Sequence, residues 1–258
     1  MKVTLFQYAT AWMNPVENLA KIADVCRNIT GTSELLVLPE MFNTGYTMKP
    51  DEIPVSWQED CIKELTRLAE DYDLAICGSM PMFKSNKWHN TMITVTKDGL
   101  LHQYDKIHLF TPAGEKEVYA EGFISTCYSI LGWKIKPLIC YDLRFPYLSY
   151  NTSIPDVIIY SANWPIARIE HWRILLRARA IENQCYVIGV NRTGKDENQY
   201  EYPGNSAIID YNGTVITEMD NFEGYSTSIL HMDKMEDFRK RLPFLNDRKS
   251  NLFNQIIV

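Results

Sequence analysis

Hydrophobic and polar residues follow two different periods along the chain, and each period predicts its own kind of element. Short apolar runs bounded by polar residues predict strands over 3–8, 34–39, 74–80, 135–139, 157–161 and 186–191, and residues 224–230 are expected to continue the sheet. Apolar residues three or four positions apart predict helices from Asn14 to Cys26, from Ser56 to Ala69, and over 171–183 and 232–241. Asn14 precedes Pro15 and Glu17, which is typical of a capped helix start.

Two glycine turns predict hairpins, one in each half of the chain. Asp98-Gly99 separates apolar segments at 91–96 and 100–104, and Asn212-Gly213 separates those at 206–211 and 214–218. No sequence repeat, flexible linker or composition break accompanies this similarity of pattern. We therefore expect one α/β domain over residues 1–258, with two packed sheets and helices outside. The tail, Asn246 to Val258, has two possible roles: it forms a strand in its own chain, or it covers part of a neighbouring subunit.

Composition and charge exclude several classes of protein. Of the 258 residues, 46% are hydrophobic and 22% are charged, which is an ordinary globular composition. The net charge of −6 and the absence of a basic run give no footprint for nucleic acid, so none is expected as a partner. No apolar run reaches membrane-spanning length, and the N-terminus lacks the pattern of a signal peptide. We expect a cytoplasmic protein with no membrane partner.

Cysteine spacing argues against a metal site. No two of the six cysteines form a C-x-x-C pair, and no His-x-x-x-His accompanies them. Most lie within apolar stretches, which is typical of reduced core cysteines in the cytosol. We therefore expect no structural zinc site.

Three reactive side chains follow predicted strands, where functional residues of α/β folds concentrate. Glu40 follows the strand before Pro39, Lys106 follows the first hairpin, and Cys140 follows the strand at 135–139. Alone, each also has an ordinary interpretation, as a turn glutamate, a lysine with a buried stem or a core cysteine. Cys140 differs from the other cysteines because charged residues follow it closely, at Asp142 and Arg144.

The three segments together resemble the nitrilase superfamily, the carbon–nitrogen hydrolases. They read LPEMF around Glu40, YDKIHLF around Lys106 and ICYDLRFP around Cys140, in the order found in that family. The resemblance implies a four-layer α-β-β-α sandwich of the nitrilase type and a homo-oligomer built on a dimer. It also implies a second glutamate in the loop after the lysine, for which Glu115 is preferred to Glu117 by its spacing to later loop residues.

Within the superfamily the chain is most similar to bacterial omega-amidases. The stretch that carries this likeness includes SANWP at 161–165, Arg168, LLRARAIENQ at 175–184 and Asn191-Arg192. It implies hydrolysis of the terminal amide of short α-keto dicarboxylic monoamides, such as 2-oxoglutaramate, through a thioester. A nitrilase or an N-carbamoyl amino acid amidohydrolase remains an alternative within the family. A non-enzymatic binding module is the alternative outside it.

The resemblance assigns a role to each catalytic residue. Glu40 takes the thiol proton of Cys140, and the thiolate attacks the amide carbon. Lys106 and the backbone N–H of Tyr141 stabilise the oxyanion. Glu115 orients Lys106 or the substrate amide. The mechanism implied by the resemblance requires no metal and no organic cofactor.

Substrate binding is expected to involve one arginine and several aromatic walls. A small carboxylate substrate needs a cation or several donors. Arg168 is the first candidate for this cation, and Arg192 and Arg144 are alternatives, although Arg144 is expected mainly to brace the turn of the nucleophile. Apolar walls are expected from Trp164, Phe42 and Tyr46.

Overall fold

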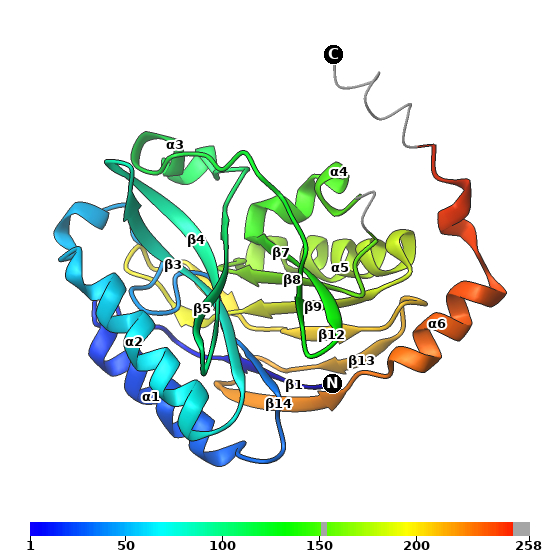
Figure 1. The fold of residues 1–258 in the computed structure, drawn as a ribbon. Coiled ribbons are helices and arrows are strands. Elements are labelled where there is room, and N and C mark those ends of the chain that lie inside the picture. Colours follow the sequence, from blue (N-terminus) through cyan, green and yellow to red (C-terminus); the bar gives the residue numbers. More distant parts are fainter. Residues whose placement is uncertain (151–153, 250–258) are drawn as a thin grey trace.

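The structure is a computed structural model that describes residues 1–150 and 154–249. Two six-stranded sheets lie face to face, and helices cover their outer faces (Figure 1). A separate two-stranded ribbon joins β10 (Thr193–Lys195) to β11 (Glu201–Pro203). This is the α/β sandwich that the resemblance implied.

The first sheet has the order β14-β1-β2-β3-β4-β5. Its strands are β1 (Lys2–Gln7), β2 (Leu35–Val37), β3 (Ala75–Lys84), β4 (Lys87–Thr96), β5 (Gly99–Asp105) and β14 (Gly224–Ile229). Strands β1, β2 and β3 are parallel, whereas β4, β5 and β14 pair antiparallel to their neighbours. The strand nearest the C-terminus therefore pairs with the strand nearest the N-terminus.

The second sheet has the order β13-β12-β9-β8-β7-β6 and a matching parallel centre. Its strands are β6 (Tyr128–Ile130), β7 (Trp133–Ile139), β8 (Val157–Ala162), β9 (Tyr186–Asn191), β12 (Ala207–Ile209) and β13 (Val215–Glu218). Strands β7, β8 and β9 are parallel, and the outer strands are antiparallel to their neighbours. Both halves of the chain thus build three parallel strands extended by antiparallel ones.

Side-chain alternation along the strands produces the layers. In β2, Leu35 and Val37 belong to the core between the sheets, whereas Leu36 belongs to the core beneath the outer helices. This follows from the two-residue period of a strand, which sends successive side chains to opposite faces. The outer core contacts α1 (Pro15–Asn28) and α2 (Ser56–Asp71), which lie together on one side of the molecule in Figure 1.

Helix α5 (Ile169–Asn183) covers the second sheet. Trp172 and Leu176 pack so close to β9 that a side chain at Gly189 would lie 2.7 Å and 2.6 Å from their atoms. The remaining helices are α3 (Glu115–Val118), α4 (Pro146–Ser149) and α6 (Met232–Arg241). Short 3-10 turns lie at Pro50–Glu52, Thr111–Ala113, Cys140–Arg144, Ile166–Arg168 and Phe244–Asp247.

The local predictions are confirmed in most places and wrong in a few. Asn14 caps α1 as expected, because its side chain accepts from the backbone N–H of Glu17 at 3.2 Å. Ser56 begins α2 but forms no cap hydrogen bond. The first long hairpin, β3 to β4, turns at Ser85-Asn86, where both residues have positive φ. This hairpin was not predicted from the sequence pattern. Residues 250–258 of the tail lie outside the described residues.

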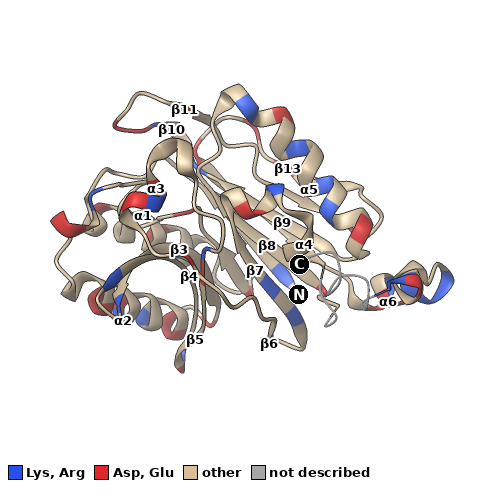
Figure 2. Ribbon diagram, turned by 90° about the horizontal axis from the view of Figure 1, so that it is seen from above, with Lys and Arg blue, Asp and Glu red and all other residues tan. Residues whose placement is uncertain are grey.

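Among the described residues, no helix is long and apolar enough to cross a membrane. Viewed from above, acidic and basic residues are interspersed along α5 and α6 (Figure 2).

Candidate active site

The site lies where strands of both sheets end at the same edge. Glu40 follows β2 of the first sheet, and Cys140 and Asn163 follow β7 and β8 of the second sheet. Two hydrogen bonds join the sheets here: Ser161 Oγ donates to the carbonyl oxygen of Leu38 at 2.7 Å, and Asn163 Nδ2 donates to that of Glu40 at 2.9 Å. The stacking of the sheets therefore fixes Glu40 relative to the thiol.

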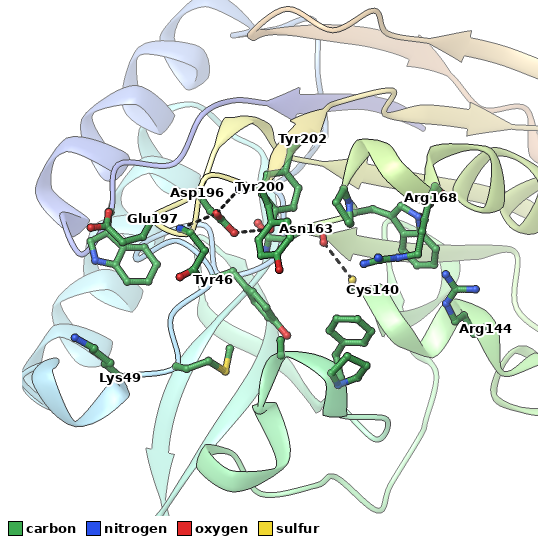
Figure 3. A pocket seen from close by; sticks show the side chains of 18 residues that line it. Tyr46, Lys49, Cys140, Arg144, Asn163, Arg168, Asp196, Glu197, Tyr200 and Tyr202 are labelled. Atoms are coloured by element: carbon green, nitrogen blue, oxygen red, sulfur yellow. Dashed lines mark hydrogen bonds between the residues drawn. The ribbon is translucent and has the colours of Figure 1, made fainter.

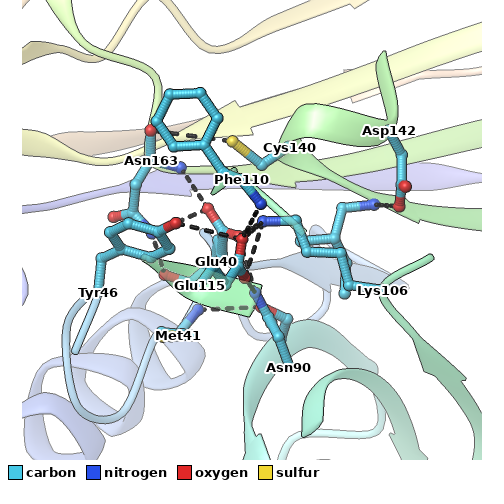
Figure 4. Close-up of polar contacts among 12 residues, drawn as sticks. Glu40, Met41, Tyr46, Asn90, Lys106, Phe110, Glu115, Cys140, Asp142 and Asn163 are labelled. Atoms are coloured by element: carbon cyan, nitrogen blue, oxygen red, sulfur yellow. Dashed lines mark hydrogen bonds and ion pairs between the residues drawn. The ribbon is translucent and has the colours of Figure 1, made fainter. Parts of the chain in front are cut away.

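Lys106 lies between two glutamates. Its Nζ is 2.8 Å from Glu40 Oε1 and 2.8 Å from Glu115 Oε2 (Figure 4). The Lys106 and Glu115 side chains are fully buried, and Glu40 is 1% exposed. Glu115 also accepts from the backbone N–H of Phe110 and from the Tyr46 hydroxyl. These contacts distinguish Glu115 from the exposed Glu117.

The charges of this cluster set the protonation state of the lysine. Burial lowers the pKa of Lys106, because it penalises the ammonium form, but Glu115 and Glu40 together raise that pKa above its ordinary value. The side chain is therefore an ammonium at neutral pH. A buried ammonium is a strong stabiliser of nearby negative charge, because few water molecules screen it.

Cys140 occupies a strained turn at the end of β7. Its φ is +41°, in the left-handed region that non-glycine residues rarely adopt outside turns and functional sites. Its Sγ lies 3.8 Å from the carbonyl oxygen of Asn163, to which the thiol donates. Burial and the charge of Glu40 raise the pKa of Cys140 well above its ordinary value, although Lys106 opposes the shift. The resting side chain is a thiol, so a base must remove its proton.

Buried groups on both sides brace this turn. Asp142 is fully buried and accepts from the backbone N–H groups of Ile139 and His108 and from the Tyr104 hydroxyl. Arg179 of α5 donates to the carbonyl oxygen of Leu143 through Nε and Nη2. Arg144, at the end of the turn, lines the cavity beside the ring of Trp164, and its Nη2 lies 3.2 Å from His171 Nδ1 of α5.

A cavity of about 650 Å³ opens over Cys140 (Figure 3). Asn163 and Trp164 line it beside the thiol, and Asp196 and Tyr200 line it from the β10–β11 ribbon. The remaining lining side chains are Trp12, Tyr46, Met48, Lys49, Phe110, Pro112, Ala113, Arg144, Pro165, Arg168, Glu197, Asn198 and Tyr202. The space exceeds what a five-carbon amide fills, and it is open to solvent on one side.

Two arginines line the cavity near the thiol. Arg144 lies over the ring of Trp164 and Arg168 over that of Phe110, at 4.8 and 5.5 Å from the ring centres. Within the described part of the chain, neither guanidinium forms an ion pair with a carboxylate. Burial and then the charge of Arg168 lower the pKa of Arg144. Two cations that repel each other without an acidic partner form a site suited to an anion.

Two of the residues predicted to bind substrate, and the ring of a third, lie outside the lining of this cavity. Phe42 is completely buried in the outer core beneath α1 and α2, so the expectation that it forms a wall is corrected. Arg192 donates to the carbonyl oxygens of Thr193 and Lys195 and is 1% exposed, so it is not available to a ligand in the cavity. The ring of Tyr141 packs edge-on against Phe110, outside the lining.

Two asparagines of the site were missed in the sequence analysis. Asn90 Nδ2 donates to Glu40 Oε1 at 2.8 Å and to Glu115 Oε1 at 3.0 Å, which joins the two carboxylates. Asn163 donates to Glu40 through its backbone N–H and its side chain. A signal existed for Asn163, since it directly follows an apolar strand. Asn90 lies inside β4 between His89 and Thr91 and gave none.

No group of three or more His, Cys, Asp or Glu side chains is arranged to hold a metal ion over residues 1–150 and 154–249. The fold and the thiol beside a buried lysine and two glutamates together define a protein of the nitrilase superfamily. A sequence model of the Carbon-nitrogen hydrolase family matches residues 2–240, and the chain belongs to this family. It is therefore an enzyme that hydrolyses carbon–nitrogen bonds.

Relatives support the assignment over almost the whole chain. The chain is 37% identical to the protein named Omega-amidase YafV of Escherichia coli (strain K12), with 96% of each chain covered. It is 32% identical to the 2-oxoglutaramate amidase of Bacillus subtilis (strain 168), covering 97% of this chain and 98% of the other. The crystal structure of XC1258 from Xanthomonas campestris, a CN-hydrolase superfamily protein, is 35% identical with a TM-score of 0.90 and 97% coverage of both chains. That structure has an arsenic adduct in its active site.

Proposed function

We propose that the protein hydrolyses the terminal amide of short α-keto dicarboxylic monoamides, such as 2-oxoglutaramate, to the acid and ammonia. The observation that carries the proposal is the Cys140 thiol beside a buried Glu–Lys–Glu cluster, at a cavity with two arginines that lack acidic partners among the described residues. The thiol and the cluster are suited to cleaving an amide, and the two arginines are suited to binding a carboxylate. Relatives named omega-amidase and 2-oxoglutaramate amidase support this substrate class.

In the first half of the reaction, Cys140 is the nucleophile and Glu40 the general base. Glu40 takes the thiol proton as sulfur attacks the amide carbon, since the raised pKa of Cys140 keeps the free thiol protonated. The Lys106 ammonium and the backbone N–H of Tyr141 stabilise the negative oxygen of the tetrahedral intermediate. Glu40 then returns the proton to the nitrogen, and ammonia leaves.

In the second half, water hydrolyses the thioester on Cys140. Glu40 takes a proton from this water and gives it to the departing thiolate. Glu115 holds Lys106 through both carboxylate oxygens, at 2.8 and 3.0 Å, and so keeps the ammonium in place during both halves. Glu115 is therefore a positioning residue in this scheme.

The arginine pair gives the proposed orientation of the substrate. Arg144 and Arg168 bind the carboxylate at the end opposite the scissile amide, and Trp164 and Tyr46 border the chain between them. Guanidinium groups suit this role, because they can donate two parallel hydrogen bonds to one carboxylate. A nitrilase has no comparable need for two cations, which favours the amidase within the family.

Ammonia release from a panel of compounds tests the proposal. The panel contains 2-oxoglutaramate, a neutral amide of similar length, an aliphatic nitrile and an N-carbamoyl amino acid. We expect kcat/KM to be highest for 2-oxoglutaramate, by at least about tenfold over the neutral amide, since an ionic hydrogen bond contributes roughly 1.5–3 kcal/mol. Faster turnover of the nitrile or the carbamoyl compound would refute this substrate class.

We also propose that residues 1–258 act as one domain in a cytoplasmic homo-oligomer. One continuous hydrophobic core includes Val3 near one end of the chain and Met235 near the other, which supports one domain. Ile174 and Ile181 expose apolar surface on α5, which supports self-association. Buried free thiols such as Cys185 support a reducing compartment. Light scattering on the purified protein tests the oligomeric state.

A further inference from the structure

The carboxylate of Glu40 has a donor at every position where it can accept. Oε1 accepts from Lys106 Nζ and from Asn90 Nδ2, both at 2.8 Å. Oε2 accepts from Asn163 twice, through the backbone N–H at 2.9 Å and through Nδ2 at 3.1 Å. An ionised carboxylate offers about four lone-pair sites, so no site is left for a proton. A base in this state must release one donor before it can act.

Asn163 contacts both partners of the proton transfer (Figure 4). Its carbonyl oxygen accepts from the Cys140 thiol, and its two N–H groups hold Glu40 Oε2. Asn163 thus holds both the sulfur atom that gives up the proton and the carboxylate oxygen that accepts it. Oε1 lies on the other side, where the Lys106 ammonium would oppose the arrival of a proton.

Of the four donors, the side-chain amide of Asn163 is the one that can be released most easily. Its bond to Oε2 is the longest of the four, and Nδ2 keeps a second acceptor in the carbonyl oxygen of Glu40 at 2.9 Å. The backbone N–H of Asn163 has no such alternative, and Lys106 would leave a buried charge. Within the described residues, Asn163 Oδ1 has no hydrogen-bond partner, so a small rotation breaks no bond at that end.

We propose that Asn163 is the positioning residue of this proton transfer and that it selects Oε2 of Glu40 as the acceptor. The inference rests on the proposed function, in which Glu40 is the base. The S–H bond of Cys140 breaks, an O–H bond forms at Oε2, and the electron pair remains on sulfur for attack on the amide carbon. Asn163 Nδ2 moves off Oε2 as the proton arrives and keeps its bond to the Glu40 carbonyl. The same oxygen later delivers the proton to the leaving nitrogen.

The chain offers a matched control in Asn191. This buried asparagine braces the same loop, since its Oδ1 accepts from the Trp164 N–H at 2.7 Å and its Nδ2 donates to the Trp164 carbonyl at 2.9 Å. Asn191→Ala therefore disturbs the loop without removing a donor from Glu40. Asn163→Ala removes the donor as well. A purely structural role for Asn163 predicts that both variants behave alike.

The test is the pH dependence of kcat/KM for ammonia release from 2-oxoglutaramate. In Asn163→Ala, the Glu40 carboxylate loses one hydrogen-bond donor that stabilises its ionised form, so it binds a proton more readily. The acidic limb of the pH profile of kcat/KM therefore moves to higher pH by about one unit. At neutral pH, kcat/KM falls about 10- to 100-fold, because the side chain of residue 163 no longer holds Oε2 in position to accept the thiol proton. In Asn191→Ala, the acidic limb keeps its wild-type position. If Asn163→Ala also keeps that position, the proposed role is wrong.

Two further variants keep the outcomes separate. Asn163→Leu keeps a similar side-chain size, has no side-chain N–H and adds no charge, so it must move the limb in the same direction even if Asn163→Ala does not fold. Glu40→Gln tests the base itself by the same assay. An active Glu40→Gln enzyme would overturn the proposed function, whereas an inactive one combined with an unshifted limb in the Asn163 variants would overturn only the role of Asn163.

Discussion

The ammonium of Lys106 lies 2.8 Å from Glu40 Oε1, and both side chains are at most 1% exposed. Glu115 lies equally close to that ammonium, so the buried cluster carries two acidic side chains for one basic one. With both carboxyl groups ionised, the charges sum to −1 (+1 −2). Unpaired buried charge destabilises a fold, so a substitution that makes this net charge more negative should be more destabilising than one that makes it neutral.

Lys106→Met is expected to be the most destabilising change in the cluster. It leaves two carboxylates close together without a cation, and breaking a buried pair in this way costs about 3–5 kcal/mol. Glu115→Gln leaves a neutral Lys106–Glu40 pair and should cost clearly less. Urea unfolding of the two variants checks this order. Equal losses, or a larger loss in Glu115→Gln, would contradict the charge argument.

Cys140→Ala is expected to abolish ammonia release while leaving the urea unfolding midpoint close to that of the wild type. The thiol makes one weak hydrogen bond, to the Asn163 carbonyl, so its loss removes little stability. Mass spectrometry after treatment with iodoacetamide should show an adduct on Cys140 in the wild type. Cys185→Ala is the control, because that thiol is fully buried and distant in sequence from the site. Residual turnover in Cys140→Ala would remove this cysteine from the nucleophile role.

Much of the layered fold and the position of the Glu–Lys–Glu cluster could be predicted from sequence. Glu40 and Cys140 each follow a strand with a clear apolar run, so their places at the edges of the sheets follow from local pattern. By contrast, β6 and the strands of the ribbon, β10 and β11, read YSI, TGK and EYP, so no apolar run marks them in the sequence.

The hydrogen bonds that complete the site depend on how the two sheets stack. Asn163 and Glu40 are 123 positions apart, and only the packed sheets bring them together. Phe42 is the opposite case, a residue close to Glu40 in sequence whose side chain lies away from the site. It is two residues from Glu40, but the turn after β2 directs its side chain into the outer core, where it lies against the position of Gly78. Proximity in sequence therefore suggested a pocket wall that the turn geometry excludes.

Stability should fall at alkaline pH because of buried thiols. Burial raises the pKa of Cys77 from 9.0 to about 11. Above pH 9 this thiol ionises in the unfolded chain but stays protonated in the folded one, so the unfolded state binds fewer protons and stability declines as pH rises. One such thiol contributes up to about 1.4 kcal/mol per pH unit. The free energy of unfolding in urea should therefore fall less between about pH 8 and about pH 10.5 in Cys77→Ala than in the wild type. Parallel pH dependence in the two proteins would contradict this assignment.

Arg144→Gln and Arg168→Gln should weaken binding of the anionic amide and leave the chemistry of bond cleavage in place. The two guanidiniums line the same cavity as Cys140, but neither belongs to the Glu–Lys–Glu cluster. Each substitution is expected to raise KM for 2-oxoglutaramate by about 10- to 100-fold, as for the loss of one ionic hydrogen bond. For a neutral amide of similar length, KM should change little, because that substrate has no carboxylate to lose a partner.

Comparing the two substrates in each variant separates recognition of charge from general damage. Damage to the cavity would lower kcat/KM for both amides by similar factors, whereas loss of a carboxylate partner lowers it for the anionic amide alone. In each single variant the remaining guanidinium still lines the cavity and should bind the carboxylate in part. The double variant should then lose more than either single one. If both amides decline in parallel, the carboxylate is bound elsewhere, and the arginine pair has another role.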